Sequence, residues 1–136
     1  MKSYARLGLA LLLAAGVSRS LACGYCVEDK IAAVYDHAAI ARALAAGREV
    51  MFCAIVGDFV SSNAMRRQIG RALGSVAGVD RGSVRVSLDA ASLSFAFDPA
   101  RAPRAGLLHT ANRKLAIKGI TLAELRVMER PAEPAR

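Results

Sequence analysis

VMFCAIV, residues 50–56, is an unbroken apolar run between the charged pair Arg48-Glu49 and the turn-forming pair Gly57-Asp58. A short run that is rich in β-forming residues and has no polar position is typical of a central strand covered on both faces. Cys53 stands in the middle of this run, so we expect it to pack as a small buried hydrophobic side chain. The run therefore predicts a sheet with something packed against each of its faces.

The segment after this strand has the pattern of a helix followed by a β-hairpin. Ser61 or Ser62 can cap the helix, and Gly78 is expected to end it. Apolar and polar residues then alternate over 84–88 and again over 93–97, which predicts two strands that share one apolar face. The residues expected to point inward from the helix are Met65, Ile69, Leu73 and Val76.

A second helix and a last strand complete the pattern. The helix is expected over 107–117, after Pro103, with Gly119 at its end. Residues 121–128 predict a strand, and residues 130–136 predict a disordered tail because two prolines interrupt them.

The segment before the first strand predicts one helix from Val27 to Ala46, which Gly47 ends. Because this helix is amphipathic, it is the candidate to cover the second face of the sheet. Its apolar residues at helical spacing are Ile31, Val34, Tyr35, Ala38 and Leu44.

The order strand, helix, strand, strand, helix, strand is that of a ferredoxin-like fold. Right-handed crossovers would place both of these helices on one face of the sheet. The sequence therefore predicts an α+β protein, a ferredoxin-like βαββαβ sandwich with an extra N-terminal helix. Residues 23–49 would hold a cysteine pair and the extra helix, residues 50–129 the sandwich, and residues 130–136 the tail.

Residues 1–22 have the features of a cleavable signal peptide. A basic start precedes an 11-residue apolar run, and the small residues Ser20 and Ala22 form a cleavage motif. Cleavage after Ala22 would leave Cys23 first in a periplasmic or secreted chain without a transmembrane span. An uncleaved anchor would need about 20 apolar residues. Lipoprotein processing at Cys23 is the other alternative, although Ser20 stands where such sites usually carry leucine.

The net charge of +8 falls to +5 if residues 1–22 are removed, because three basic residues go with them. The remaining basic residues are scattered among acids, no basic run is interleaved with aromatic residues, and tryptophan is absent. This composition is typical of a solvated cationic surface, and we expect no nucleic-acid partner.

Cys23-Gly24-Tyr25-Cys26 is the feature of the sequence that most suggests chemistry. In an oxidising compartment such a pair can form a disulfide, a redox couple or two metal thiolates. The spacing alone does not choose between these three.

Four short motifs are found between residues 78 and 120: Gly78-Val79, the strand of Val84, Val86 and Leu88, the hairpin end Phe97-Asp98-Pro99, and Lys118-Gly119-Ile120. Through these motifs, residues 50–128 resemble the heavy-metal-associated domains of copper chaperones, metal-pumping ATPases and the periplasmic mercury-binding protein. The resemblance implies a ferredoxin-like fold. That family holds its metal with a Cys-x-x-Cys in the loop after the first strand, whereas the loop 57–63 here has no thiol. None of its metal ligands is therefore carried over to this loop.

We expect Cys23 and Cys26 to bind a soft cation instead, as paired thiolates suited to Cu(I), Hg(II) or Zn(II). The free amine of a mature Cys23 could add a ligand, and His37 is a distant candidate for another. The expected partner is an envelope metal-transport protein or a thiol protein.

Two other functions fit the same residues. Cys-Gly-Tyr-Cys is similar to the active pair of the thioredoxin and glutaredoxin families, which implies a thiol-disulfide redox protein, although those families place the pair after a strand. Alternatively, the pair forms a structural disulfide and the domain is a non-catalytic interaction module. No serine or cysteine has a recognisable base partner and no glycine-rich phosphate loop is present, so we expect no enzymatic activity.

Overall fold

The computed structural model describes residues 26–132. The predicted signal peptide, Cys23 and residues 133–136 of the predicted tail lie outside this part. The elements in chain order are α1 (Val27–Ala32), α2 (His37–Ala45), β1 (Glu49–Gly57), α3 (Asn63–Gly74), the short 3-10 helix η1 (Arg81–Ser83), β2 (Arg85–Ser87), β3 (Ser92–Phe97), α4 (Arg104–Ala116) and β4 (Ile120–Met128).

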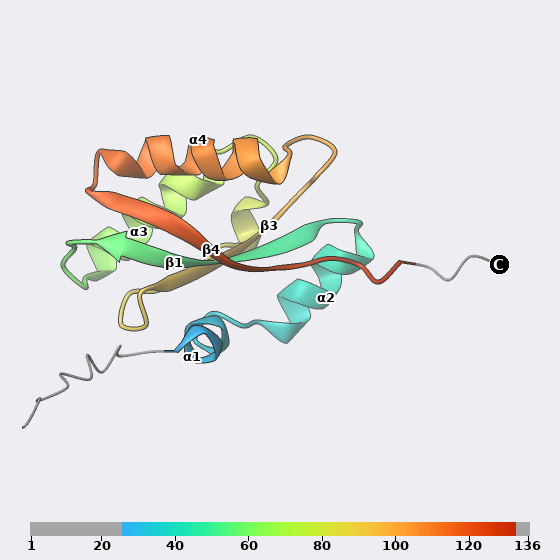
Figure 1. The fold of residues 1–136 in the computed structure, drawn as a ribbon, viewed down its shortest axis with the longest axis horizontal. Helices are drawn as coiled ribbons and strands as arrows, with labels where there is room; N and C mark the ends of the chain where they lie inside the picture. Colours follow the sequence, from blue (N-terminus) through green and yellow to red (C-terminus); the bar gives the residue numbers. More distant parts are fainter. Residues whose placement is uncertain (1–25, 133–136) are drawn as a thin grey trace, which may run out of the picture.

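The protein is an α+β domain built on one four-stranded sheet with the order β2-β3-β1-β4 (Figure 1). All three strand pairs are antiparallel. The apolar run lies in β1, which is flanked by β3 and β4. The predicted central strand is therefore confirmed. A register shift in the β1–β4 pair falls between Phe52 and Cys53.

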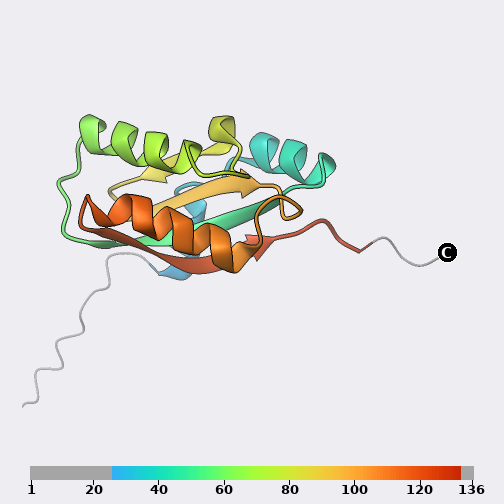
Figure 2. The ribbon, with the colours of Figure 1, turned by 90° about the horizontal axis from the view of Figure 1, so that it is seen from above.

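Helices α3 and α4 cover one face of the sheet (Figures 1 and 2). Met51, Cys53 and Ile55 alternate along β1 and point into this larger core. The core also contains Ile69 and Leu73 from α3, Phe95 and Phe97 from β3, and Leu107, Ala111 and Leu115 from α4.

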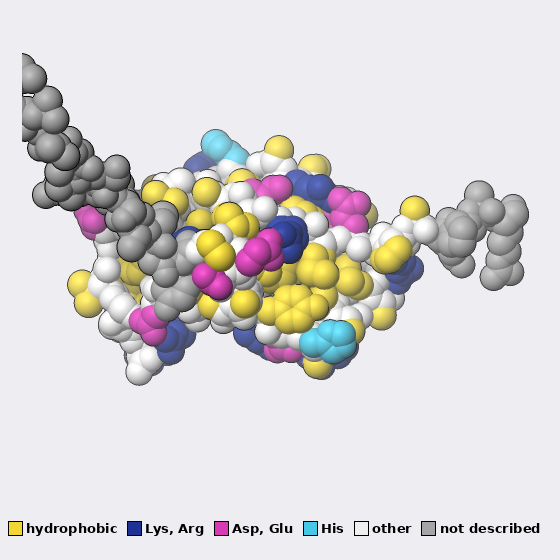
Figure 3. All heavy atoms as spheres, turned by 60° about the horizontal axis from the view of Figure 1, so that its bottom comes forward, with side chains coloured by type: hydrophobic (Ala, Val, Ile, Leu, Met, Phe, Trp, Pro, Cys, Tyr) yellow, Lys and Arg dark blue, Asp and Glu magenta, His cyan; other side chains and the backbone are white. Residues whose placement is uncertain are grey.

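Helices α1 and α2 cover the second face, over β1 and β3. Val50 and Phe52, the intervening residues of β1, point toward these helices and form a smaller core with Ile31, Ile40 and Ala43. The prediction that the N-terminal segment covers the second face is therefore confirmed. Figure 3, turned to bring this side forward, shows hydrophobic side chains beside acidic and basic ones.

The single helix expected over 27–46 is wrong, because the chain forms two helices with a break at 33–36. Asp36 is the N-cap of α2, and its Oδ1 accepts a hydrogen bond of 3.0 Å from the Ala39 amide. The Ala39 amide and Arg85 hold the pKa of Asp36 below its usual value, since both favour the ionised carboxylate. The apolar residues keep their helical spacing across the break, so the capping aspartate is the local sign of it in the sequence.

The other helix boundaries agree only in part with the expected ones. Ser62, rather than Ser61, caps α3, with its Oγ 3.1 Å from the Met65 amide. This helix ends at Gly74 instead of Gly78, although Val76 beyond it is still buried. Helix α4 starts earlier than expected, at Arg104 directly after Pro103.

Arg130, the first residue of the predicted tail, donates hydrogen bonds to the carbonyls of Leu44 and Ala45 at the end of α2. Within the described residues, no helix has the length and apolarity needed to cross a membrane.

Candidate functional site

Cys26 is the one residue of the predicted metal pair that lies in the described part of the chain. It occupies the N-cap position of α1 and its side chain is exposed. Its thiol donates a hydrogen bond of 3.1 Å to Oδ2 of Asp29, three residues further along. An accessible sulfur therefore lies beside a carboxylate at the start of a helix.

The side chains of Lys30, Glu28 and Ser94 hold α1 and the chain after it against the sheet and so position Cys26. Nζ of Lys30 donates to the carbonyls of Ala90 and Ala91 in the β2–β3 turn, at 3.0 and 3.3 Å. Glu28 pairs with Arg126 of β4 at 2.5 Å. At the end of α1, the buried Ser94 hydroxyl donates to the carbonyl of Val34 at 2.9 Å.

The described residues around Cys26 do not form a complete metal site. Within residues 26–132, no group of three or more histidine, cysteine, aspartate or glutamate side chains is arranged to hold a metal ion. His37, at the start of α2, therefore does not complete a site with Cys26 and Asp29. The thiol and one carboxylate oxygen are the donors that the described residues provide at this position.

Cys53 has the opposite environment. Its side chain is fully buried in the larger core, as the apolar run predicted. Burial, with a smaller contribution from the charge of Glu124, raises the pKa of its thiol to about 12. A protonated, inaccessible thiol is a poor nucleophile and a poor metal ligand. Cys26 and Cys53 form no disulfide with each other.

The loop after β1 serves to turn the chain and to start α3. Ser62 is the helix cap, and Oγ of Ser61 donates to Asp89 across to the β2–β3 turn at 3.0 Å. The loop lies close to the turn before β4 and needs a glycine at its start. A Cβ on Gly57 would come within 2.2 Å of the Gly119 carbonyl oxygen. Phe59 and Val60 line an open hollow of about 630 Å³ here.

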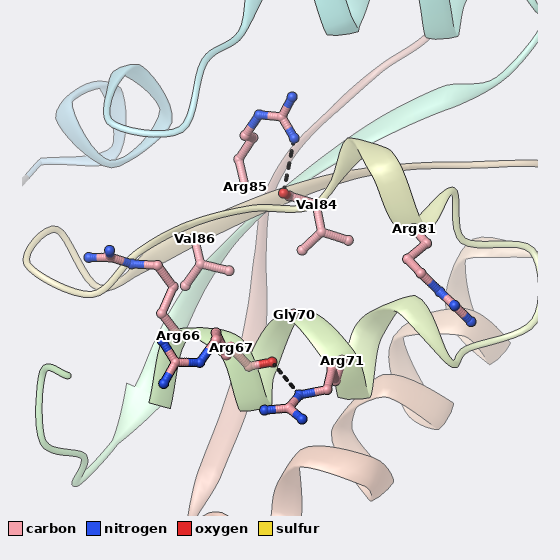
Figure 4. A pocket seen from close by; sticks show the side chains of 8 residues that line it. All are labelled: Arg66, Arg67, Gly70, Arg71, Arg81, Val84, Arg85 and Val86. Carbon is pink, nitrogen blue, oxygen red and sulfur yellow. Dashed lines mark hydrogen bonds between the residues drawn. The ribbon is translucent and has the colours of Figure 1, made fainter. Parts of the chain in front are cut away.

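A groove that the sequence analysis did not identify runs between α3 and β2 (Figure 4). Its cavity volume is about 980 Å³. Val84 and Val86 point toward the helix, while Arg85 between them points to the other side of the sheet. The remaining lining residues are Arg66, Arg67, Gly70, Arg71 and Arg81.

The arginines of this groove belong to the basic residues that were predicted to form a solvated cationic surface. Arg66, Arg67 and Arg71 are indeed exposed on α3. What the sequence did not reveal is that Arg81 and the strand β2 come to the same helix face.

Comparison with known proteins adds no further assignment. No protein-family model matches the sequence, and neither the curated proteins nor the solved structures include one that matches it.

Proposed function

We propose that this is an exported protein that binds one soft cation through Cys23 and Cys26. The observation that carries the proposal is the contrast between the thiols. Cys26 is exposed on a fixed helix and stands three residues after Cys23, whereas Cys53 is buried and protonated. A chain that keeps one thiol inert and presents another next to a second cysteine has the residues of a thiolate site at its N-terminal end.

The ferredoxin-like fold is part of the same proposal. The strand order β2-β3-β1-β4, with α3 and α4 together on one face, is compatible with that fold. It supports the resemblance to heavy-metal-associated domains, with the thiol pair moved from the loop after β1 to the segment before α1. Helix α1 lies on the opposite face of the sheet from α3 and α4, so a metal site there would present a different surface to a partner.

The donor set favours Cu(I) or Hg(II) over Zn(II). Two thiolates satisfy a two-coordinate soft ion, whereas a structural Zn(II) site takes four ligands. The Asp29 carboxylate lies within hydrogen-bond distance of the Cys26 sulfur and could add an oxygen. Because a metal would displace the proton that joins this pair, metal binding should weaken as the pH falls.

A competitive titration tests the metal site. Reduced protein is titrated with Cu(I) and with Hg(II) against a chelator of known affinity, beside a Cys23→Ser, Cys26→Ser variant. We expect tight one-to-one binding that the double variant loses. Cys53→Ala is the matched control, since it also removes a thiol and should bind as tightly as the parent. Equal affinity of the parent and the double variant would contradict the proposal.

Thiol-disulfide exchange is the second candidate, and the hydrogen bond from Cys26 to Asp29 favours it. A carboxylate 3.1 Å from the sulfur is placed to accept the thiol proton when the sulfur attacks a disulfide. A reduction potential of the Cys23–Cys26 pair above about −300 mV is expected for a redox protein. A lower potential would indicate a structural disulfide instead.

Export and the expected partner class have their own test. Mass spectrometry of the protein recovered from the cell envelope should give a chain that begins at Cys23. A soluble envelope fraction is expected for a periplasmic protein, and a diacylated, membrane-bound Cys23 would instead indicate a lipoprotein. A metal-loaded protein crosslinked through its lysine side chains should capture an envelope metal-transport or thiol protein.

A further inference from the structure

The groove between α3 and β2 has the features of a peptide-binding site, and its cations are the first of them. Arg66, Arg67, Arg71 and Arg81 have no carboxylate within ion-pair distance anywhere in residues 26–132. The side chains of Arg66, Arg71 and Arg81 donate hydrogen bonds to neutral groups, namely the Asn63 side-chain oxygen and the carbonyls of Arg67 and Gly74. By contrast, Arg48, Arg104 and Arg126 pair with acids elsewhere on the surface, and Arg85, whose side chain points to the other side of the sheet, pairs with Asp36.

The second feature is an apolar floor. Val84 and Val86 point from the strand toward α3 and are only partly buried (Figure 4). Gly70 faces them from the helix, and a Cβ at Gly70 would have no atom within 4 Å. The absence of a side chain at this position keeps the space between helix and strand open.

The third feature is an unpaired strand edge. β2 is the terminal strand of the sheet and pairs with β3 alone. The Ala96 amide donates to Oγ of Ser83, and its carbonyl accepts from the Asp80 amide, so the backbone of Ala96 faces the β2 side. By the alternation of a strand, Ser94 and Ser92 face the same way and pair with Arg85 and Ser87.

The backbone of Val86, between those two residues, therefore points outward from the sheet edge. Its N–H and C=O are available to a further strand. The side chain of Val86 lies on the α3 face, so the residue opposite it in an added antiparallel strand would place its side chain in the arginine-lined groove.

From these three features, we propose that the groove binds an extended acidic segment of a partner protein, which adds to β2 as an antiparallel strand. Alternate acidic side chains of this segment pair with Arg66, Arg67, Arg71 and Arg81, while its backbone bonds to Val86. The intervening side chains face the other side of the sheet, near the Arg85–Asp36 ion pair.

Charge argues for this occupant over two others. A second copy of the chain pairing through β2 would bring the two arginine clusters together, and like charges across an interface oppose association. A single-stranded nucleic acid would satisfy the arginines, but the groove floor is aliphatic and offers no aromatic ring on which bases could stack.

Fluorescence polarisation with a labelled peptide tests the proposal. The probe is a blocked ten-residue peptide of alternating glutamate and threonine, added to the purified full chain at about 50 mM salt, where screening is weak. Saturable binding is expected. Arg67→Gln with Arg71→Gln should weaken it about tenfold. The control, Arg113→Gln with Lys114→Gln, removes the same charge from an exposed part of α4 that does not line the groove and should leave the affinity unchanged.

Two N-methylated peptides separate strand addition from simple charge attraction. In the first peptide, the backbone nitrogens of the glutamates are methylated. These are the nitrogens that would donate to Val86, so binding should be abolished. In the second peptide, the backbone nitrogens of the threonines are methylated, and binding should be unchanged. Equal behaviour of the two peptides, equal weakening by both double variants, or no binding of the parent peptide would overturn the proposal. So would displacement of the peptide by ten-nucleotide oligo-dT as effectively as by unlabelled peptide.

Discussion

At the scale of single residues, the chain shows how environment separates two chemically identical side chains. Cys26 is exposed and lies beside a carboxylate, while Cys53 is buried in the larger core. The burial that makes Cys53 inert also couples its protonation to folding, since an ionised thiol cannot be accommodated among apolar side chains. This coupling gives a pH dependence that a single substitution can isolate.

The free energy of unfolding should fall above about pH 9 because of Cys53. The thiol ionises near pH 9.0 in the unfolded chain but has a pKa of about 12 in the core. A raised native pKa means that its contribution is complete below pH 9 and is lost as the pH rises toward 12, by about 1.4 kcal/mol per unit. Urea unfolding of the reduced parent and of Cys53→Ala at pH 7 to 10.5 measures this difference. Parallel pH curves for the two proteins would contradict the assignment.

The burial of Cys53 was predictable because every residue near it in sequence is apolar. The Asp29 carboxylate beside Cys26 was visible in sequence only as an acid in the first helical turn, and its hydrogen bond to the sulfur depends on a side-chain rotamer. The cluster of four unpaired groove arginines was harder still to predict from the sequence. Three of them come from α3, and Arg81 comes from a segment that reaches them only in the folded chain.

At the scale of elements, one of two neighbouring serines on β3 bonds to the chain between α1 and α2. Ser92 and Ser94 are both buried on the strand. Oγ of Ser94 donates to the Val34 carbonyl at 2.9 Å, whereas Oγ of Ser92 has no partner among the described residues. The two residues have the same chemistry and similar burial, so they form a matched pair for measuring this attachment.

Ser94→Ala should lower the free energy of unfolding by about 1–3 kcal/mol, because it leaves the Val34 carbonyl buried without a partner. Ser92→Ala should leave it unchanged or raise it, since the substitution removes a buried hydroxyl that has no hydrogen bond. Denaturant unfolding of both variants measures the two effects. Equal destabilisation would show that the Ser94 bond does not hold α1 in place.

The elements themselves were mostly predictable, and the errors have a common cause. The strands and α3 follow from local periodicity, which also predicted the hairpin of β2 and β3 and the central place of β1. The break between α1 and α2 did not follow, because it depends on the Asp36 cap and on a hydrogen bond between residues 60 positions apart in sequence. A local pattern carries no information about such a distant partner.

At the scale of the whole molecule, the sheet is shared by two cores of unequal size. β1 contributes to both, with Met51 and Cys53 on one face and Val50 and Phe52 on the other. A strand that is buried on both faces couples the unfolding of the two helical layers. If either layer unfolds, one face of the same strand is exposed to water. The N-terminal helices are therefore expected to fold together with the rest of the domain rather than as an independent appendage.

Ile40→Ala in α2 tests this expectation, since Ile40 is 6% exposed in the smaller core. The substitution should lower the free energy of unfolding by about 2–5 kcal/mol. It should also keep a single transition when followed by both far-UV circular dichroism and tyrosine fluorescence, to which Tyr35, stacked on Phe52, contributes. Val60→Ala, at a residue that is 75% exposed, is the control and should have little effect. Two separate transitions in the Ile40 variant would show that α1 and α2 unfold alone, and that the larger core does not need them.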